Sequence, residues 1–230
     1  MSAPFVVAVD GPSGSGKSSV SRAVAAHLGG GYLDTGAMYR ALTWWCLETG
    51  VDLADLDAVA AAAQELPLAM SADPAEPGVL VGDDDVTEAI RTSQISAQVS
   101  AVATNPGVRV ALQEQQRDLI TVIGDEQGSV VAEGRDVTTV VAPDADVRLL
   151  LTASEEARLR RRTVELHGAA DEQALEATRD EVVRRDRDDS SVSQFLVAAD
   201  GVLTLDTSEM TFEESVAAAI AAVDAVRPAG

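Results

Sequence analysis

A glycine-rich stretch near the start of the chain has the residue types and spacing needed to hold a phosphate group. Gly11, Gly16, Lys17 and Ser18 match the pattern G-x-x-x-x-G-K-[ST]. Glycines let the backbone bend so that successive N–H groups face one anion, and a following helix adds the positive end of its dipole. The Lys17 ammonium could reach the β- and γ-phosphates of a nucleotide, and the Ser18 hydroxyl could ligate Mg²⁺. The stretch predicts a P-loop comprising Gly11, Pro12, Ser13, Gly14, Ser15, Gly16, Lys17, Ser18 and Ser19.

The use of lysine in this chain supports the P-loop interpretation. Lys17 is the only lysine, and the other sixteen basic residues are arginines. At a phosphate, the compact ammonium of lysine on its flexible stem cannot be replaced by the planar guanidinium of arginine. This favours a phosphate-binding loop over a chance glycine turn that carries a solvated lysine.

Half of the arginines lie in one segment of the chain, between Arg158 and Arg187. On a helix, Arg158, Arg161 and Arg162 would share one face through their i, i+3 and i+4 spacing. A basic helix is often only a solvated face. Beside a P-loop in an acidic protein, however, these arginines could close over a transferred phosphoryl group, stabilise its charge and exclude water.

A second group of arginines is scattered along the chain: Arg40, Arg91, Arg109 and Arg135. Each could equally form a surface ion pair. Their positions after Thr35-Gly36 and Glu133-Gly134 favour a second anion site that faces the P-loop. The group that receives the phosphoryl would then itself be an anion, with a phosphate.

The elements that must position these residues alternate between apolar strands and helices. Five short apolar runs predict buried strands, at residues 6–9, 32–34, 129–132, 147–152 and 202–206. Helical spacing is found at residues 18–28, 37–45, 53–65, 89–103, 108–123, 154–165, 174–188 and 211–226. This alternation predicts an α/β fold with a doubly wound parallel sheet. Ligands bind at the carboxyl ends of such strands, which here carry residues 11–18, 34–36, 133–136 and 206–207.

A short segment interrupts this alternation. Residues 66–70 and 78–81 are extended runs separated by proline and glycine, and they predict an antiparallel hairpin. Residues 82–86 predict a further turn. The segment is therefore interpreted as a small antiparallel insert in the α/β unit.

Composition limits the class of protein. A length of 230 residues suits one α/β domain with inserts or two small domains. The net charge of −21 argues against a general affinity for nucleic acid or for an anionic membrane. No apolar stretch approaches the roughly 18 residues of a membrane span. Cys46 is the single cysteine, so no intrachain disulfide can form, and we expect a cytoplasmic setting.

Several strings in this sequence resemble bacterial cytidylate (CMP) kinase. They are DGPSGSGKSS at residues 10–19, LDTGAMYR at 33–40, IRT at 90–92 and EGRD at 133–136. The small insert before Arg91 is similar too, and the resemblance extends from about residue 5 to residue 220. It implies a P-loop NTPase fold in one domain, 1–230, with a five-stranded parallel sheet flanked by helices. An NMP-binding insert is implied at about residues 62–100 and a helical lid at about 154–192.

The resemblance implies transfer of the γ-phosphate of ATP to CMP and dCMP, with Mg²⁺ held in part by Ser18. It makes the P-loop the ATP-binding segment, and we expect a monomer that acts in pyrimidine nucleotide biosynthesis and salvage. The catalytic residues it implies are Lys17, Arg135, Arg158 and Arg162. The CMP-binding residues it implies are Thr35, Arg40, Ser100, Arg109, Arg135, Asp136, Arg185 and Asp189.

Within that set, the resemblance divides the roles by position. The resemblance assigns binding of the acceptor phosphate to Arg40, Arg109 and Arg135. It assigns recognition of the cytosine ring to Ser100, Arg109 and Asp136. The amino group at N4 of cytosine needs an acceptor such as Asp136 or Ser100, whereas N3 and O2 accept from a guanidinium. Uracil would leave the carboxylate unpaired, which a buried site disfavours. Thr35 would contact the nucleotide, and Arg185 and Asp189 its sugar hydroxyl.

Two departures from the family pattern predict weakened activity or altered base selectivity. The family usually has Arg-Asp-x-x-Asp-Ser-x-Arg followed by Ser-Pro-Leu, but Val192 follows residues 185–191 here, and the final arginine is missing. Thr138 stands where the family has glycine, and Ala142 where an aromatic residue is common.

Other classes of protein remain as alternatives. A different P-loop kinase of nucleoside monophosphates or other small molecules fits the loop alone, but the string at 33–40 and the insert disfavour it. A nucleotide-binding protein that lost turnover is a second alternative. A GTPase switch needs an Asn-Lys-x-Asp element to read its base, and that element is absent here because the only lysine, Lys17, lies in the P-loop.

Overall fold

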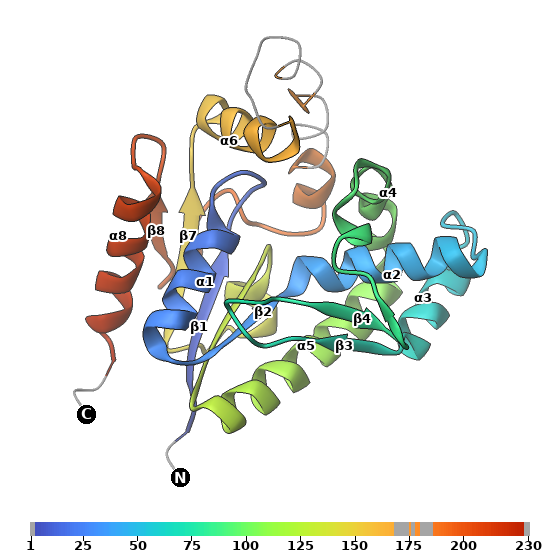
Figure 1. The fold of residues 1–230 in the computed structure, drawn as a ribbon, viewed down its shortest axis with the longest axis horizontal. Helices are drawn as coiled ribbons and strands as arrows, with labels where there is room; N and C mark the ends of the chain where they lie inside the picture. Colours follow the sequence, from blue (N-terminus) through green and yellow to red (C-terminus); the bar gives the residue numbers. More distant parts are fainter. Residues whose placement is uncertain (1–2, 168–174, 176–177, 180–185, 228–230) are drawn as a thin grey trace.

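A five-stranded parallel sheet forms the centre of the computed structural model, which describes residues 3–167, 175, 178–179 and 186–227 (Figure 1). The strands lie in the order β2-β6-β1-β7-β8. Their bounds are β1 (Phe5–Asp10), β2 (Gly31–Asp34), β6 (Ser129–Gly134), β7 (Val147–Thr152) and β8 (Leu203–Asp206). Asp10 pairs in register with Gly134, and Asp34 with Glu133, so these strands end at one edge of the sheet. The predicted α/β fold with five parallel strands is confirmed.

Helices cover both faces of this sheet. Their bounds are α1 (Lys17–Leu28), α2 (Thr35–Thr49), α3 (Leu56–Glu65), α4 (Ser93–Ala103), α5 (Pro106–Gln127), α6 (Glu155–His167) and α8 (Phe212–Asp224). Side chains of β1 alternate between the faces. Val7 and Val9 pack with α1 and α8, whereas Ala8 packs with the core that contains α2, α3, α4 and α5. Figure 1 shows α1 and α8 side by side at one end of the molecule.

The predicted antiparallel insert is present as a second, three-stranded sheet. It contains β3 (Leu68–Met70), β4 (Val79–Val81) and β5 (Asp84–Asp85), in that order. The segment expected to be only a turn thus also contains β5, because the chain reverses at Gly82 and pairs again with β4. The tip of the insert reaches α1, where Nε of Arg22 donates to the carbonyl of Pro74 at 2.7 Å (Figure 1).

Three helix starts differ from the sequence expectation, each because a side chain caps the helix. α2 begins at Thr35, two residues early, since Asp34 accepts a hydrogen bond from the N–H of Ala37 at 2.9 Å. α3 begins at Leu56 because Asp55 caps it. The helix expected at 89–103 is divided into the 3₁₀ helix η1 (Ala89–Arg91) and α4, which Thr92 caps. Most of the helix expected at 174–188 lies outside the described residues.

The part of the chain described here contains no helix that is both long and apolar enough to cross a membrane.

Candidate active site

The P-loop joins β1 to α1 and depends on two glycines with left-handed backbone. Gly14 has φ of 74° and Gly16 has φ of 87°, a region that residues with a Cβ rarely adopt. A Cβ on Gly14 would also lie 2.6 Å from the carbonyl oxygen of Arg158 in α6. The loop therefore has its predicted conformation, and α6 lies directly against it.

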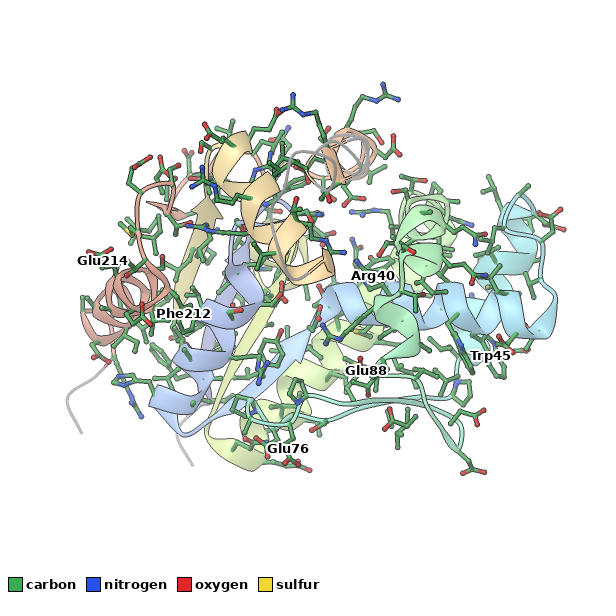
Figure 2. The ribbon with its side chains drawn as sticks, turned by 45° about the horizontal axis from the view of Figure 1, so that its top comes forward. Arg40, Trp45, Glu76, Glu88, Phe212 and Glu214 are labelled. Atoms are coloured by element: carbon green, nitrogen blue, oxygen red, sulfur yellow. The ribbon has the colours of Figure 1, made fainter. Side chains whose placement is uncertain are left out.

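A large cavity opens in front of this loop. This P-loop cavity has a volume of about 510 Å³ and is lined by the first turn of α1 and by Arg22, Arg161 and Phe212, among others. Phe212, half exposed at the start of α8 (Figure 2), contributes an apolar ring to the lining. The size is that of a typical small-molecule site.

Glu133, at the end of β6, lies against both reactive side chains of the P-loop. Its Oε2 is 3.6 Å from Nζ of Lys17, and its Oε1 accepts a 2.5 Å hydrogen bond from the Ser18 hydroxyl. The Tyr32 hydroxyl donates to the same Oε1 at 3.1 Å. Burial raises the pKa of Glu133, and the Lys17 charge opposes that rise. Sequence reasoning gave this residue no role, although an acidic residue ending the strand beside a P-loop strand is the usual partner of the loop's metal.

A second cavity, the arginine cavity, collects positive charge on the other side of Lys17. Its cationic residues are Lys17, Arg40, Arg91, Arg135 and Arg162, which come from α1, α2, η1, the segment after β6, and α6. Arg40 lies where α2 meets the η1–α4 segment (Figure 2) and donates to the Ile90 carbonyl at 3.1 Å and the Ser96 hydroxyl at 2.9 Å. Such a ring of cations can hold an anion although the whole protein is acidic.

A third cavity continues from the arginine cavity and shares Gly36, Gly134 and Arg135 with it. Asp136 lies in its wall together with Thr35, Tyr39, Val99, Ala103, Arg109, Asp189 and Val192, and we call it the Asp136 cavity. The buried Asp136 carboxylate accepts hydrogen bonds from Nη2 of Arg109 at 2.8 Å and from Nε2 of Gln113 at 2.7 Å. The walls combine apolar side chains with a few polar groups, as sites for aromatic rings do.

Arg135 sits between the cavities and is held on several sides. Its Nε donates to Asp189 at 2.5 Å and its Nη1 to the Gly11 carbonyl at 2.7 Å. The guanidinium carbon also lies 4.5 Å from the centre of the buried Phe195 ring, in cation–π geometry. No sequence pattern indicated a role for Phe195, which stands near the position of the family's Pro-Leu pair.

The arginines of α6 hold the P-loop from above. Arg158 donates to the carbonyl of Ser13 at 3.0 Å and to Asp186, whose other carboxylate oxygen accepts the Ser13 N–H at 3.2 Å. Arg161 donates to the carbonyl of Thr207 at 2.6 Å. The buried Arg162 reaches the arginine cavity.

Asp10 organises the turn that carries Asp136. Its carboxylate accepts from the backbone N–H groups of Val137 and Thr138, each at 2.9 Å, and from the Thr138 hydroxyl at 2.6 Å. Burial raises the pKa of Asp10, and these bonds oppose the rise. Threonine at the family's glycine position thus gains a bond, and no described non-glycine residue needs a positive φ. This leads into the π-helical turn η2 (Val137–Val141).

The structure brings most of the predicted site residues to these three cavities. Ser100 lies on α4, but its neighbours Val99 and Ala103 line the Asp136 cavity and Ser100 does not. Arg185 lies outside the described residues. Among the described side chains, no cluster of three or more His, Cys, Asp or Glu could hold a metal. A metal at the P-loop would rely on the oxygens of Ser18 and Glu133, which suit Mg²⁺.

The sequence is similar to one family of known proteins over almost its whole length. The family model described as cytidylate kinase matches residues 7–225. The cytidylate kinase of Streptomyces avermitilis is 44% identical over 225 residues, which cover 97% of this chain and 94% of that protein. The one from Rhodococcus opacus is 49% identical over 214 residues, covering 91% and 90%. The one from Mycobacterium avium is 46% identical over 213 residues, covering 92% and 91%.

Proposed function

Because this chain belongs to the cytidylate kinase family, it is a phosphotransferase that phosphorylates CMP with ATP, and we propose that its three cavities divide the reaction. The P-loop cavity takes ATP, the arginine cavity takes the acceptor phosphate, and the Asp136 cavity takes the acceptor base. dCMP is a second acceptor. The observation that carries this proposal is that Lys17 lines both the P-loop cavity and the arginine cavity. A phosphoryl group can therefore pass between two anions within reach of one ammonium.

On the donor side, the backbone N–H groups of residues 11–19 hold the phosphates of ATP, and Lys17 neutralises charge on the β- and γ-phosphates. Ser18 and Glu133 would hold Mg²⁺, since their oxygens already share a 2.5 Å hydrogen bond. The metal would neutralise charge on the phosphate oxygens. On binding the cation, Glu133 would lose the hydrogen bond that it accepts from the Ser18 hydroxyl.

On the acceptor side, the 5′-phosphate is held by Arg40, Arg109 and Arg135, and Arg109 also contacts the base. Arg158 and Arg162 belong to a lid, at about residues 154–192, and act on the transferred group. A small insert, at about residues 62–100, supplies Arg91, which lines both the P-loop cavity and the arginine cavity. Catalysis by these groups is positioning and charge stabilisation, without a covalent enzyme intermediate.

In the Asp136 cavity, Asp136 accepts from the N4 amino group of cytosine and Arg109 donates to N3 or O2. Thr35 and Asp189 contact the rest of the nucleotide. Ser100 does not line this cavity, so Asp136 is the proposed acceptor for the N4 amino group, and the predicted contact of Arg185 with the sugar lies outside the described residues. The missing arginine at Val192 leaves an apolar wall in this cavity.

The single domain acts as a monomer in the cytoplasm. Its net charge of −21 disfavours nucleic acid as a partner. The cations needed for two anionic substrates are gathered locally around Lys17.

A panel of acceptors tests this function. ADP formation from Mg·ATP is measured with CMP, dCMP, UMP, AMP and shikimate. We expect turnover with CMP and dCMP that exceeds turnover with the other acceptors by about tenfold or more, since the wrong ring leaves buried polar groups unpaired. A preference for AMP, UMP or shikimate would contradict the assignment. Tight CMP binding without ADP formation would instead identify a nucleotide-binding protein without turnover.

A further inference from the structure

Gln113 is a buried amide that contacts the proposed base-reading carboxylate. It lies on α5 one turn after Arg109, so both side chains reach Asp136 from the same face of the helix. Its Nε2 donates to Oδ2 of Asp136 at 2.7 Å, and Arg109 donates to the same oxygen at 2.8 Å. The position is buried beside Leu112 and Gln116, where an amide is otherwise unfavourable.

The two donors leave the carboxylate with one engaged oxygen and one open oxygen. Among the hydrogen bonds of the described residues, Oδ1 of Asp136 accepts none, while Asp136 lines the Asp136 cavity. Two fixed donors on Oδ2 define the plane of the carboxylate, which a single donor would allow to rotate. Arg109 also keeps further N–H groups for a ligand, because a guanidinium has five donors.

We propose that Gln113 is the positioning residue that sets base selection, by holding Asp136 so that Oδ1 faces the acceptor base. This inference rests on the proposed function, in which that base is cytosine. A fixed Oδ1 accepts from an amino group and repels a carbonyl oxygen at the same ring position. A carboxylate that is free to turn away would bind the amino group of cytosine less well. It would also repel the carbonyl oxygen of uracil less strongly. Gln113 should therefore govern the ratio of CMP to UMP turnover more than the overall rate.

The test is Gln113→Met, which keeps the length of the side chain and removes the donor. The matched control is Gln115→Met on the same helix, where Gln115 donates instead to the Ala63 carbonyl at 3.2 Å. For each protein, kcat/KM is measured with CMP and UMP, and KM with ATP. We expect the CMP-to-UMP ratio of Gln113→Met to fall by about tenfold, as loss of a hydrogen bond to a charged group gives. The KM for ATP and the ratio of the control should stay within about twofold of the parent.

A parent-like ratio in Gln113→Met, or an equal loss with CMP and UMP, would overturn the inference. Should that variant not fold, Gln113→Leu decides in its place, because it also removes the donor and places an apolar side chain at a buried position. Its ratio should also fall, and an unchanged ratio would overturn the inference. The parent protein is assayed with CMP before any variant is compared. If the parent does not form ADP with CMP, the proposed function itself is contradicted.

Discussion

The P-loop cavity and the Asp136 cavity are built in opposite ways. The first is formed chiefly by one continuous segment, which contains two glycines with left-handed backbone. The second is formed by side chains from α2, α4, α5, the turn after β6, and residues 189–193. A backbone site depends on a few residues that nothing else can replace. A side-chain site distributes its function over many contacts, so single changes there should have graded effects.

The largest effect should come from Lys17→Ala, which tests the concentrated site. Lys17 borders both the P-loop cavity and the arginine cavity, and we expect kcat to fall by about 10²–10³, as for loss of one group that stabilises transition-state charge. ADP formation with saturating CMP measures this. Arg117→Ala serves as a control, because its guanidinium donates to the Val140 carbonyl on an exposed surface. A Lys17→Ala enzyme that keeps a tenth of the parent rate would remove the contrast between the two cavities.

A smaller effect is expected from Arg135→Ala, at the junction of the arginine and Asp136 cavities. Other cations line the same wall, so kcat/KM for CMP should fall by about 10-fold to 100-fold. The KM for ATP should change by less than about threefold, because Arg135 does not line the P-loop cavity. Steady-state kinetics with each substrate varied separates the two. An equal rise in both KM values would show that the cavities are not independent.

The smallest effect concerns stability, and it arises from Glu133→Gln without nucleotide present. Because burial raises the pKa of Glu133, its proton stabilises the folded state below the unfolded pKa near 4.5. That contribution is lost as the pH rises through the folded pKa. Glutamine does not ionise, so Tm of the variant minus Tm of the parent should become more positive between about pH 4.5 and pH 7.5. A change of about 2–4 °C corresponds to about 1 kcal/mol in a domain of this size.

Thermal unfolding of both proteins across that pH range measures the difference. A difference that becomes more negative with rising pH would mean that the Lys17 ammonium outweighs burial in setting the charge of Glu133. Lys17 and Glu133, which both line the arginine cavity, would then form a stabilising ion pair in the protein without nucleotide.

The fold and the P-loop were predictable because both depend on patterns of residues that are close together in the sequence. Apolar runs such as residues 147–152 predicted β7 with its observed bounds, and the glycine spacing predicted the loop. Helix starts were less predictable. In the sequence, Asp34 is typical of a turn, whereas in the structure its side chain accepts a hydrogen bond from the N–H of Ala37 and caps α2. The spacing of apolar residues alone does not show which side chain will cap a helix.

The interior of the Asp136 cavity was not predictable in full, because its contacts join residues far apart in sequence. Gln113 meets Asp136 only after α5 packs beside the turn that follows β6. Phe195 meets Arg135 across an even longer separation. One signal was available: Gln113 follows Arg109 by four residues, which places a second polar side chain on the same helix face.

The solitary lysine gives this protein a built-in reporter. Isotopic labelling of lysine would introduce one side-chain ammonium signal, and it would arise from the point where the P-loop and arginine cavities meet. An acylating reagent would find only one ε-amino group, and that group is largely shielded beside Glu133. Nucleotide occupancy could thus be followed by magnetic resonance or by mass spectrometry without introducing any foreign probe.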